Sequence, residues 1–243
     1  MLKIIAYPLS VIYFVFFGLT LIVFHPIQWV CVHFFGYEAH KRSVSILNWC
    51  LMRCTHILGT RYTFTNKHSI PENVPLIVAV NHQSMNDIPP LIWFLRKYHP
   101  KFVAKKELAK GVPSVSFNLR HGGSVAIDRK DAKQALSQIT KLGQYIEKNK
   151  RSAVIFPEGS RSRDGKPKPF KSTGLKVLMQ NAPSAIIVPI SINNSWKLLR
   201  YGKFPMGLGN HITFEVHPPI KNTDDFDQLV AQTEALVKKG IKQ

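Results

Sequence analysis

The stretch Pro75-Leu-Ile-Val-Ala-Val-Asn-His-Gln-Ser-Met-Asn-Asp87 gives the clearest indication of how this chain folds. Its first part, Leu76–Val80, is a short apolar run rich in β-branched residues, which is typical of a buried strand. His82 follows this run, and Asp87 precedes a proline-containing apolar segment that favours the start of a helix. Open α/β sheets build their sites in loops that follow the carboxyl ends of strands. We therefore expect a functional loop at residues 81–87.

His82 and Asp87 cannot share one face of a continuous helix. Five residues at roughly 100° each would leave them about 140° apart, so an element boundary must separate them. In a loop, a neutral imidazole could remove a proton from an alcohol while the carboxylate holds its other ring nitrogen. The alternative is that Asp87 only caps the following helix and His82 is a hydrogen-bonded turn residue.

A second stretch, Phe156-Pro-Glu-Gly-Ser-Arg-Ser162, follows another apolar run at Ser152–Phe156. The planar guanidinium of Arg161 suits a phosphate group, and Gly159 would let the backbone approach a ligand closely. Since two strand-end loops can face one cleft, the two stretches together predict a base and an anion-binding loop. The alternative is that the second stretch is only a basic surface turn.

Four ordered blocks give the chain a resemblance to the glycerolipid acyltransferase family, of the bacterial 1-acylglycerol-3-phosphate acyltransferase type. Between about residues 75 and 192, the matching segments are His82 to Asp87 (histidine, four-residue gap, aspartate), Gly123-Ser-Val-Ala-Ile-Asp-Arg129, Phe156-Pro-Glu-Gly-Ser-Arg161 and Val188-Pro-Ile190. Lys105-Lys-Glu-Leu108 resembles the stretch before the second block. Ser160 replaces a frequent threonine, and Ala126 replaces a frequent aromatic residue, which leaves the shape of the lipid pocket open.

The resemblance implies an O-acyltransferase that moves a fatty acyl group from a thioester to the free hydroxyl of 1-acylglycerol 3-phosphate, giving phosphatidic acid. The donor would be acyl-CoA or acyl-ACP, and neither a cofactor nor a metal is expected. The resemblance implies that His82 is the general base, that Asp87 assists it, and that no acyl-enzyme forms. It also implies acceptor binding by Lys105, Arg129, Glu158, Gly159 and Arg161.

Three alternative functions stay open at this point. The acceptor could be another lysolipid, water could take its place in a lipid hydrolase, or the protein could bind lipids without catalysis. The absence of a Gly-x-Ser-x-Gly turn disfavours a serine hydrolase, although a water mechanism would not need one. The presence of both His82 and Asp87 disfavours a noncatalytic role.

The N-terminal region is predicted to be a membrane anchor. Residues 4–24 contain no Lys, Arg, Asp or Glu, and no small-residue cleavage site follows them, so the segment is expected to be retained. Residues 27–35 are also apolar and follow His25-Pro26. We expect either a helical hairpin joined by a proline turn within one leaflet, which the resemblance favours, or a single transmembrane pass. Both place the catalytic domain at the cytoplasmic side of the inner membrane.

The remaining chain predicts an α/β fold with a mostly parallel central sheet flanked by helices. We assign residues 1–58 to a membrane-associated helical segment and residues 59–243 to one acyltransferase domain. Strands are expected at 62–64, 76–80, 102–104, 124–127, 153–156, 186–192 and 211–216. Helices are expected at 88–97, 107–119, 131–149, 169–181 and 225–239.

A formal net charge of +19 calls for anionic partners. Membrane lipids, a phosphorylated lysophospholipid acceptor and the phosphates of the donor all fit this requirement. Nucleic acid is disfavoured, because no zinc spacing, stacking motif or basic tail is present. Cys31, Cys50 and Cys54 are expected to pack within helices rather than to form disulfides or bind a metal.

Overall fold

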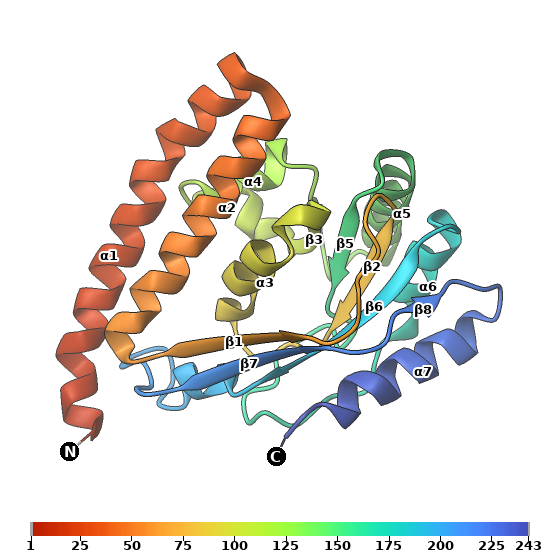
Figure 1. Cartoon of the computed structure of the whole chain (residues 1–243). Helices are drawn as coiled ribbons and strands as arrows, with labels where there is room; N and C mark the ends of the chain where they lie inside the picture. The colour runs from red at the N-terminus through yellow and green to blue at the C-terminus, as the bar shows by residue number, and fades with distance from the viewer. Residues whose placement is uncertain (1, 243) are drawn as a thin grey trace.

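The computed structural model describes residues 2–242 of the 243-residue chain. Figure 1 shows one twisted sheet with helices on both faces and two long N-terminal helices along one side. The eight strands lie in the order β1-β7-β6-β2-β5-β3-β4, and β8 pairs with β6. Their bounds are β1 Arg61–Asn66, β2 Leu76–Val80, β3 Pro100–Lys105, β4 Val125–Ile127, β5 Ser152–Ile155, β6 Ile186–Asn193, β7 His211–Val216 and β8 Ile220–Lys221.

The sheet is mostly parallel, which confirms the predicted fold class. Strand β2 runs parallel to both β5 and β6, β5 parallel to β3, and β3 parallel to β4. Among the strands of residues 2–242, only the pairings of β6 with β7 and β8 are antiparallel. The carboxyl ends of β2, β5, β3 and β4 therefore meet along one edge of the sheet.

Helices cover both faces of the sheet (Figure 1). The helices α3 and α4 and the two N-terminal helices lie on one face, and the helices α5, α6 and α7 lie on the other. Their bounds are α1 Leu2–Val30, α2 Gly36–Cys54, α3 Ile88–Phe94, α4 Val115–His121, α5 Ala132–Asn149, α6 Ser172–Asn181 and α7 Phe226–Lys239.

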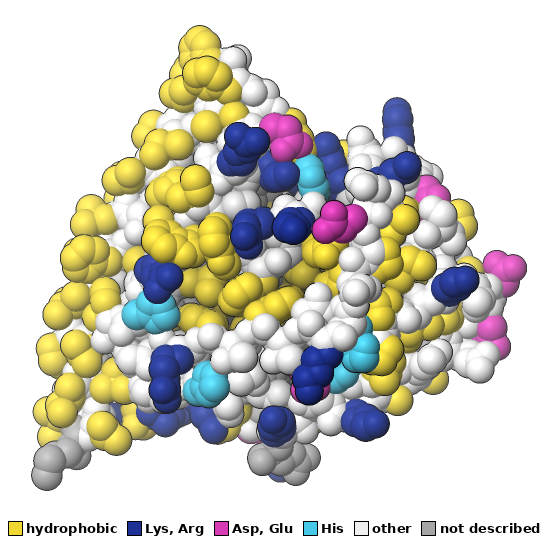
Figure 2. All heavy atoms as spheres, viewed as in Figure 1, with side chains coloured by type: hydrophobic (Ala, Val, Ile, Leu, Met, Phe, Trp, Pro, Cys, Tyr) yellow, Lys and Arg dark blue, Asp and Glu magenta, His cyan; other side chains and the backbone are white. Residues whose placement is uncertain are grey.

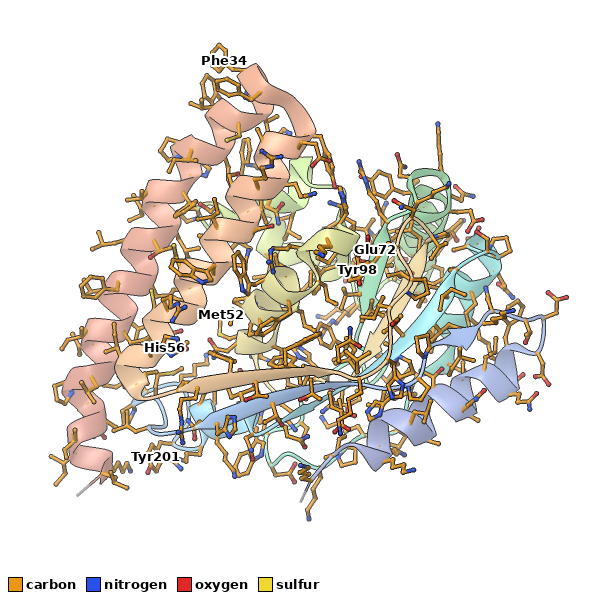
Figure 3. All side chains as sticks on the ribbon, viewed as in Figure 1. Phe34, Met52, His56, Glu72, Tyr98 and Tyr201 are labelled. Atoms are coloured by element: carbon orange, nitrogen blue, oxygen red, sulfur yellow. The ribbon has the colours of Figure 1, made fainter. Side chains whose placement is uncertain are left out.

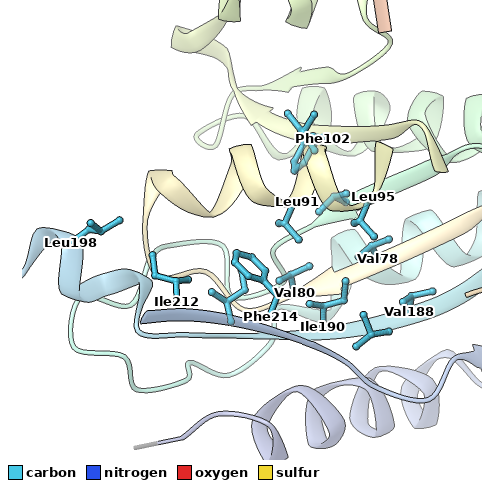
Figure 4. Packing of buried hydrophobic residues seen from close by; sticks show 14 of the residues in the cluster. Val78, Val80, Leu91, Leu95, Phe102, Val188, Ile190, Leu198, Ile212 and Phe214 are labelled. Atoms are coloured by element: carbon cyan, nitrogen blue, oxygen red, sulfur yellow. The ribbon is translucent and has the colours of Figure 1, made fainter. Parts of the chain in front are cut away.

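Strand β2 divides the hydrophobic core, because its side chains alternate between the two faces of the sheet. Val78 and Val80 pack in the layer of α3, as Figure 4 shows, while Ile77 and Ala79 pack in the layer of α5 and α6. All residues of this strand are buried, as expected for a parallel strand covered on both faces. Strand β2 thus lies at the centre of the molecule.

The predicted helix at 107–119 is wrong. Residues Lys106–Ala109 form a single 3-10 turn, a loop follows, and α4 begins only at Val115. Pro113 lacks a backbone N–H and disfavours a helical residue before it, while Gly111 has φ +78°, so one continuous helix cannot run through residues 110–114. The short strand β8 was also missed, because two residues carry no periodicity.

The predicted proline turn at His25-Pro26 is also wrong. The helix α1 continues through Pro8 and Pro26 to Val30, and a π-helical segment follows at Cys31–Phe35. The chain reverses at Gly36, where φ is 73° and ψ is −165°, a region that residues with a side chain avoid. The second arm of the hairpin is therefore α2 rather than the apolar segment at 27–35.

The outer face of α1 is apolar and exposed. Figure 2 shows hydrophobic side chains along its whole length, and Phe34 points outward at the tip of the hairpin in Figure 3. By length and composition, this region contains one helix that could cross a membrane. The inner face of α1 packs against the domain through buried residues that include Ala6, Ser10 and Tyr13.

Candidate functional site

His82 and Asp87 form a hydrogen-bonded pair across an element boundary, as the helix geometry required. His82 lies in the loop after β2, and Asp87 ends the 3-10 turn Met85–Asp87 that precedes α3. The distance between His82 Nδ1 and Asp87 Oδ2 is 2.8 Å. Because an ionised carboxylate only accepts hydrogen bonds, Nδ1 carries the proton and Nε2 is left as the basic nitrogen.

The backbone of the same loop fixes the Asp87 carboxylate. The N–H groups of Gln83 and Ser84 also donate to Oδ2, at 2.8 and 2.9 Å, and the residue is fully buried. Ser84 and Asp87 form a capping box around the 3-10 turn, and Asp87 makes no side-chain cap bond to α3. The carboxylate therefore orients the imidazole and its loop rather than only capping the following helix.

The imidazole of His82 is held on one face by Phe156, the first residue after β5. The two ring centroids lie 4.1 Å apart at an interplanar angle of 22°. The side chain of His82 keeps 14% of its exposure, and within residues 2–242 its Nε2 makes no hydrogen bond. The ring is thus fixed by Asp87 and Phe156, and its basic nitrogen is free to meet an acceptor hydroxyl.

The loop after β5 is joined to the loop after β2. The N–H of Ser162 donates to the carbonyl of His82 at 2.7 Å. Glu158 lies in the same loop and is only 2% exposed, and its Oε2 has no hydrogen-bond partner among the described residues. Burial, with a smaller contribution from the charge of Asp87, raises the pKa of Glu158 to about 7, against backbone hydrogen bonds from Lys168 and His82 that lower it. The Oε2 atom of this carboxyl group, beside the histidine, is therefore available to bind a hydroxyl group.

Gly159 and Arg161 form the tip of this loop. Gly159 has φ +69°, and a Cβ there would lie 3.2 Å from the side chain of Lys171. Arg161 is exposed, and among the described residues its guanidinium makes no hydrogen bond or ion pair. Lys168 holds the loop, because its ammonium donates to the Ser160 hydroxyl at 2.9 Å and to the Arg161 carbonyl at 2.8 Å. The tip is therefore basic and presents an unpaired guanidinium.

Lys105 and Arg129 lie at the same edge of the sheet, but farther along it. Lys105 ends β3 opposite Ile127, the last residue of β4, and Arg129 follows two positions later. Both side chains are exposed, and Lys105 forms an ion pair with Glu107 at 2.8 Å. The structure thus brings together His82, Asp87 and Glu158 in direct or near contact and places the other predicted residues along the adjoining strand ends. Acceptor binding by these residues stays a prediction.

Three supporting residues were missed from the sequence. The side chain of Asn81 joins β2 to β6 through both the N–H and the carbonyl of Ile192, at 2.6 and 2.9 Å. Gln83 accepts a hydrogen bond from the N–H of Ser195 at 2.9 Å. Asn81 and Gln83 are the two neighbours of His82, and Phe156 is the first residue of the stretch Phe156–Ser162. Their positions beside the predicted site residues were the signal that could have identified them.

Comparison with known proteins agrees with this geometry. A model of the acyltransferase family matches residues 61–193, which include both site loops. The chain belongs to the acyltransferase family. The resemblance inferred from the four blocks is thereby confirmed.

Curated acyltransferases of several organisms resemble the chain. The 1-acyl-sn-glycerol-3-phosphate acyltransferase of Helicobacter pylori is 36% identical over 134 residues, which cover 51% of this chain and 54% of that protein. The enzyme of the same name from Borreliella burgdorferi is 28% identical over 181 residues, covering 74% of this chain and 70% of that protein. The chain spans about half the length of several curated relatives that it matches.

One solved acyltransferase structure shares the fold. The 1-acyl-sn-glycerophosphate acyltransferase of Thermotoga maritima superposes with a TM-score of 0.83 and 22% identity. The superposition covers 99% of this chain and 96% of the other one. The N-terminal hairpin and the sheet are therefore both part of the shared fold.

Proposed function

We propose that this protein transfers a fatty acyl group from a thioester donor to the free hydroxyl of 1-acylglycerol 3-phosphate, giving phosphatidic acid. The observation that supports this most directly is the His82–Asp87 pair, with its hydrogen bond of 2.8 Å and its unoccupied Nε2. Family membership and the names of the curated relatives support the same reaction. The donor would be acyl-CoA or acyl-ACP.

In the proposed reaction, His82 Nε2 removes the proton of the acceptor hydroxyl as its oxygen attacks the thioester carbonyl. Asp87 holds the Nδ1 proton and stabilises the imidazolium that forms. The tetrahedral intermediate collapses with cleavage of the carbon–sulfur bond. The imidazolium then returns its proton to the departing thiolate, so atoms and charges balance without a covalent enzyme intermediate.

The acceptor would lie along the carboxyl edge of the sheet. The basic loop tip with Arg161 would bind its phosphate, and Glu158 beside His82 would bind its glycerol oxygen. Lys105 and Arg129 lie at the neighbouring strand ends and would add positive charge to the same edge. The exposed apolar face of α1 would keep this edge at a membrane, where the lipid substrates are located. We propose that this membrane is the inner membrane and that the catalytic edge lies at its cytoplasmic face.

A direct assay tests the proposed function. Purified full-length protein with labelled acyl donor and lysophosphatidic acid should release labelled phosphatidic acid. His82→Ala should lose this activity, whereas His68→Ala, a matched change of a half-buried histidine outside the site, should keep it. Labelled free fatty acid as the main product would instead indicate a hydrolase. Product from another lysolipid only would change the acceptor, and no product from a panel of lysolipids would indicate a lipid-binding protein.

A further inference from the structure

A second polar cavity lies at the opposite edge of the sheet from His82. It is formed where α2 begins, where β3 begins and just before β4, and its lining includes Tyr37, His40, Lys41, His99 and Lys101. Strands β3 and β5 are parallel, so their amino ends lie about one strand length from the loops of the catalytic edge. A strand of five residues spans roughly 16 Å. The cavity is therefore separate from the proposed acyltransferase site.

The cavity is small, with a volume of about 30 Å³. Such a volume corresponds to about two ordered water molecules, so it suits a compact polar group rather than a fatty chain. A larger cavity of about 250 Å³ adjoins it and shares His99. Glu72 and Tyr98, labelled in Figure 3, line this larger cavity together with Lys97 and Lys150.

Positive charge dominates the small cavity. The ammonium of Lys101 lies 4.9 Å from the ring centroid of Tyr37, and the guanidinium carbon of Arg151 lies 3.8 Å from it. Lys101 is only 5% exposed, yet across residues 2–242 no carboxylate forms an ion pair with Lys101 or Arg151. The carboxylate of Glu38 pairs instead with Lys41 at 3.0 Å and lies 4.0 Å from Nδ1 of His99. A buried cation without an anionic partner is costly, so an anion bound beside Lys101 would be stabilising.

The hydrogen bonds of the cluster show the same shortage of acceptors. Lys41 can only donate, so it donates to His99 Nε2 at 3.1 Å, and His99 Nδ1 must then donate to the Tyr37 hydroxyl at 2.9 Å. A protonated Lys101 also donates to this hydroxyl, at 2.9 Å. Tyr37 thus accepts twice and its own proton is left to donate. Among the described residues, the guanidinium of Arg151 has no acceptor at all.

A buried and unpartnered nitrogen adds an independent indication. His40 is 2% exposed, lines the cavity, and its Nε2 has no hydrogen-bond partner within residues 2–242. Burial, with smaller contributions from the charges of Arg151 and Lys41, lowers the pKa of Lys101 to about 7. Burial also lowers the pKa of His99 to about 4. Burial is the main cause of both shifts, and the neighbouring positive charges add to it.

We propose that this cluster is a second binding site, distinct from the acyltransferase site, which binds one phosphate group through Lys41, Lys101, Arg151, Tyr37 and His40. A phosphate oxygen accepts several hydrogen bonds, and a guanidinium and an ammonium bind it through charge-assisted ones. The phosphate could belong to a soluble phosphate ester, with its organic part in the adjoining cavity, or to a lipid headgroup near the hairpin tip.

Calorimetric titration of full-length protein in detergent with inorganic phosphate tests the site, with sodium chloride as the control salt. Because phosphate can also bind at the catalytic edge, the titration is repeated in Arg161→Ala. We expect binding that persists in Arg161→Ala and in the surface control Lys221→Met. It should weaken at least tenfold in both Lys101→Met and Arg151→Gln. Binding that is lost in Arg161→Ala but unchanged in Lys101→Met would overturn the proposal.

Two further arms identify the source of the phosphate. Glycerol 3-phosphate is titrated into the same variants, and flotation is measured with phosphatidylcholine vesicles that contain or lack phosphatidic acid. Dependence of glycerol 3-phosphate binding on Lys101 would support a soluble ester, and dependence of phosphatidic acid flotation on Lys101 would support a headgroup. No effect of Lys101→Met or Arg151→Gln on phosphate, ester or vesicles refutes the site, whatever the acyltransferase activity.

Discussion

Asp87→Asn is the substitution that isolates the charge of the proposed catalytic pair. The amide oxygen of asparagine can take the place of Oδ2, which accepts from His82, Gln83 and Ser84. The amide nitrogen then takes the place of Oδ1, which has no hydrogen-bond partner within residues 2–242. We therefore expect the fold to survive, with a loss of about 1–2 kcal/mol in the free energy of unfolding.

The catalytic cost should be much larger. Two unit charges about 4 Å apart attract by about 4 kcal/mol at an effective dielectric constant of about 20. This attraction exists only when His82 is an imidazolium, so it stabilises the transition state and not the resting enzyme. Since about 1.4 kcal/mol corresponds to a factor of ten in rate, kcat for Asp87→Asn should fall about 10³-fold.

Kinetics of the single and double variants test this reasoning. Initial rates with labelled acyl donor and lysophosphatidic acid are measured for Asp87→Asn, His82→Ala and the double variant, and circular dichroism checks the fold. Because Asp87 acts through His82, the double variant should be no slower than His82→Ala. A further large decrease in the double variant, or a fall of less than tenfold in a folded Asp87→Asn, would refute a shared role.

Four further changes test other parts of the structure. Phe156→Leu removes the ring stacked on His82, so kcat should fall about 3- to 10-fold with little change in KM for the acceptor. Arg161→Ala should raise KM about 10- to 100-fold for lysophosphatidic acid but not for monoacylglycerol; equal losses would contradict phosphate binding. Because burial raises the pKa of Glu158 from 4.5 to about 7, protein stability should fall as pH rises through this interval, and Glu158→Gln should flatten the dependence of Tm on pH. Gly36→Ala should destabilise the hairpin by about 1–3 kcal/mol in chemical denaturation, since its φ is 73°.

The sequence predicted the sheet well because burial there is encoded in short apolar runs. Leu76–Val80 and His211–Val216 were placed at their observed bounds, since both runs end at polar residues or turns. The hairpin was predicted less well. Two prolines in α1 suggested a break, but the helix continues through both, and a single glycine six residues beyond its end makes the turn. Tertiary packing of α1 and α2 outweighs the local preference of Pro26.

The candidate site could be predicted only in part. The spacing of His82 and Asp87 required an element boundary, and the structure has one there. The stacking of Phe156 and the bonds of Asn81 to β6 depend on which strands are neighbours. The order of the strands cannot be predicted from residues 75–87 or 156–162. The cluster around Lys101 was missed for the same reason, because Tyr37 of α2, Lys101 of β3 and Arg151 before β5 meet only in the folded chain.

The inner face of α1 has a practical consequence for the boundary between anchor and enzyme. Tyr13 is 2% exposed within the main core, and its hydroxyl lies 3.3 Å from the side chain of Asn86, next to Asp87. Ser10 likewise accepts a hydrogen bond from the N–H of Met206 at 2.8 Å. The apolar helix α1 thus also forms part of the hydrophobic core. A truncated chain starting at residue 59 would lose these contacts. Any gain in solubility would therefore be accompanied by disorder in the loop that carries Asn86 and Asp87.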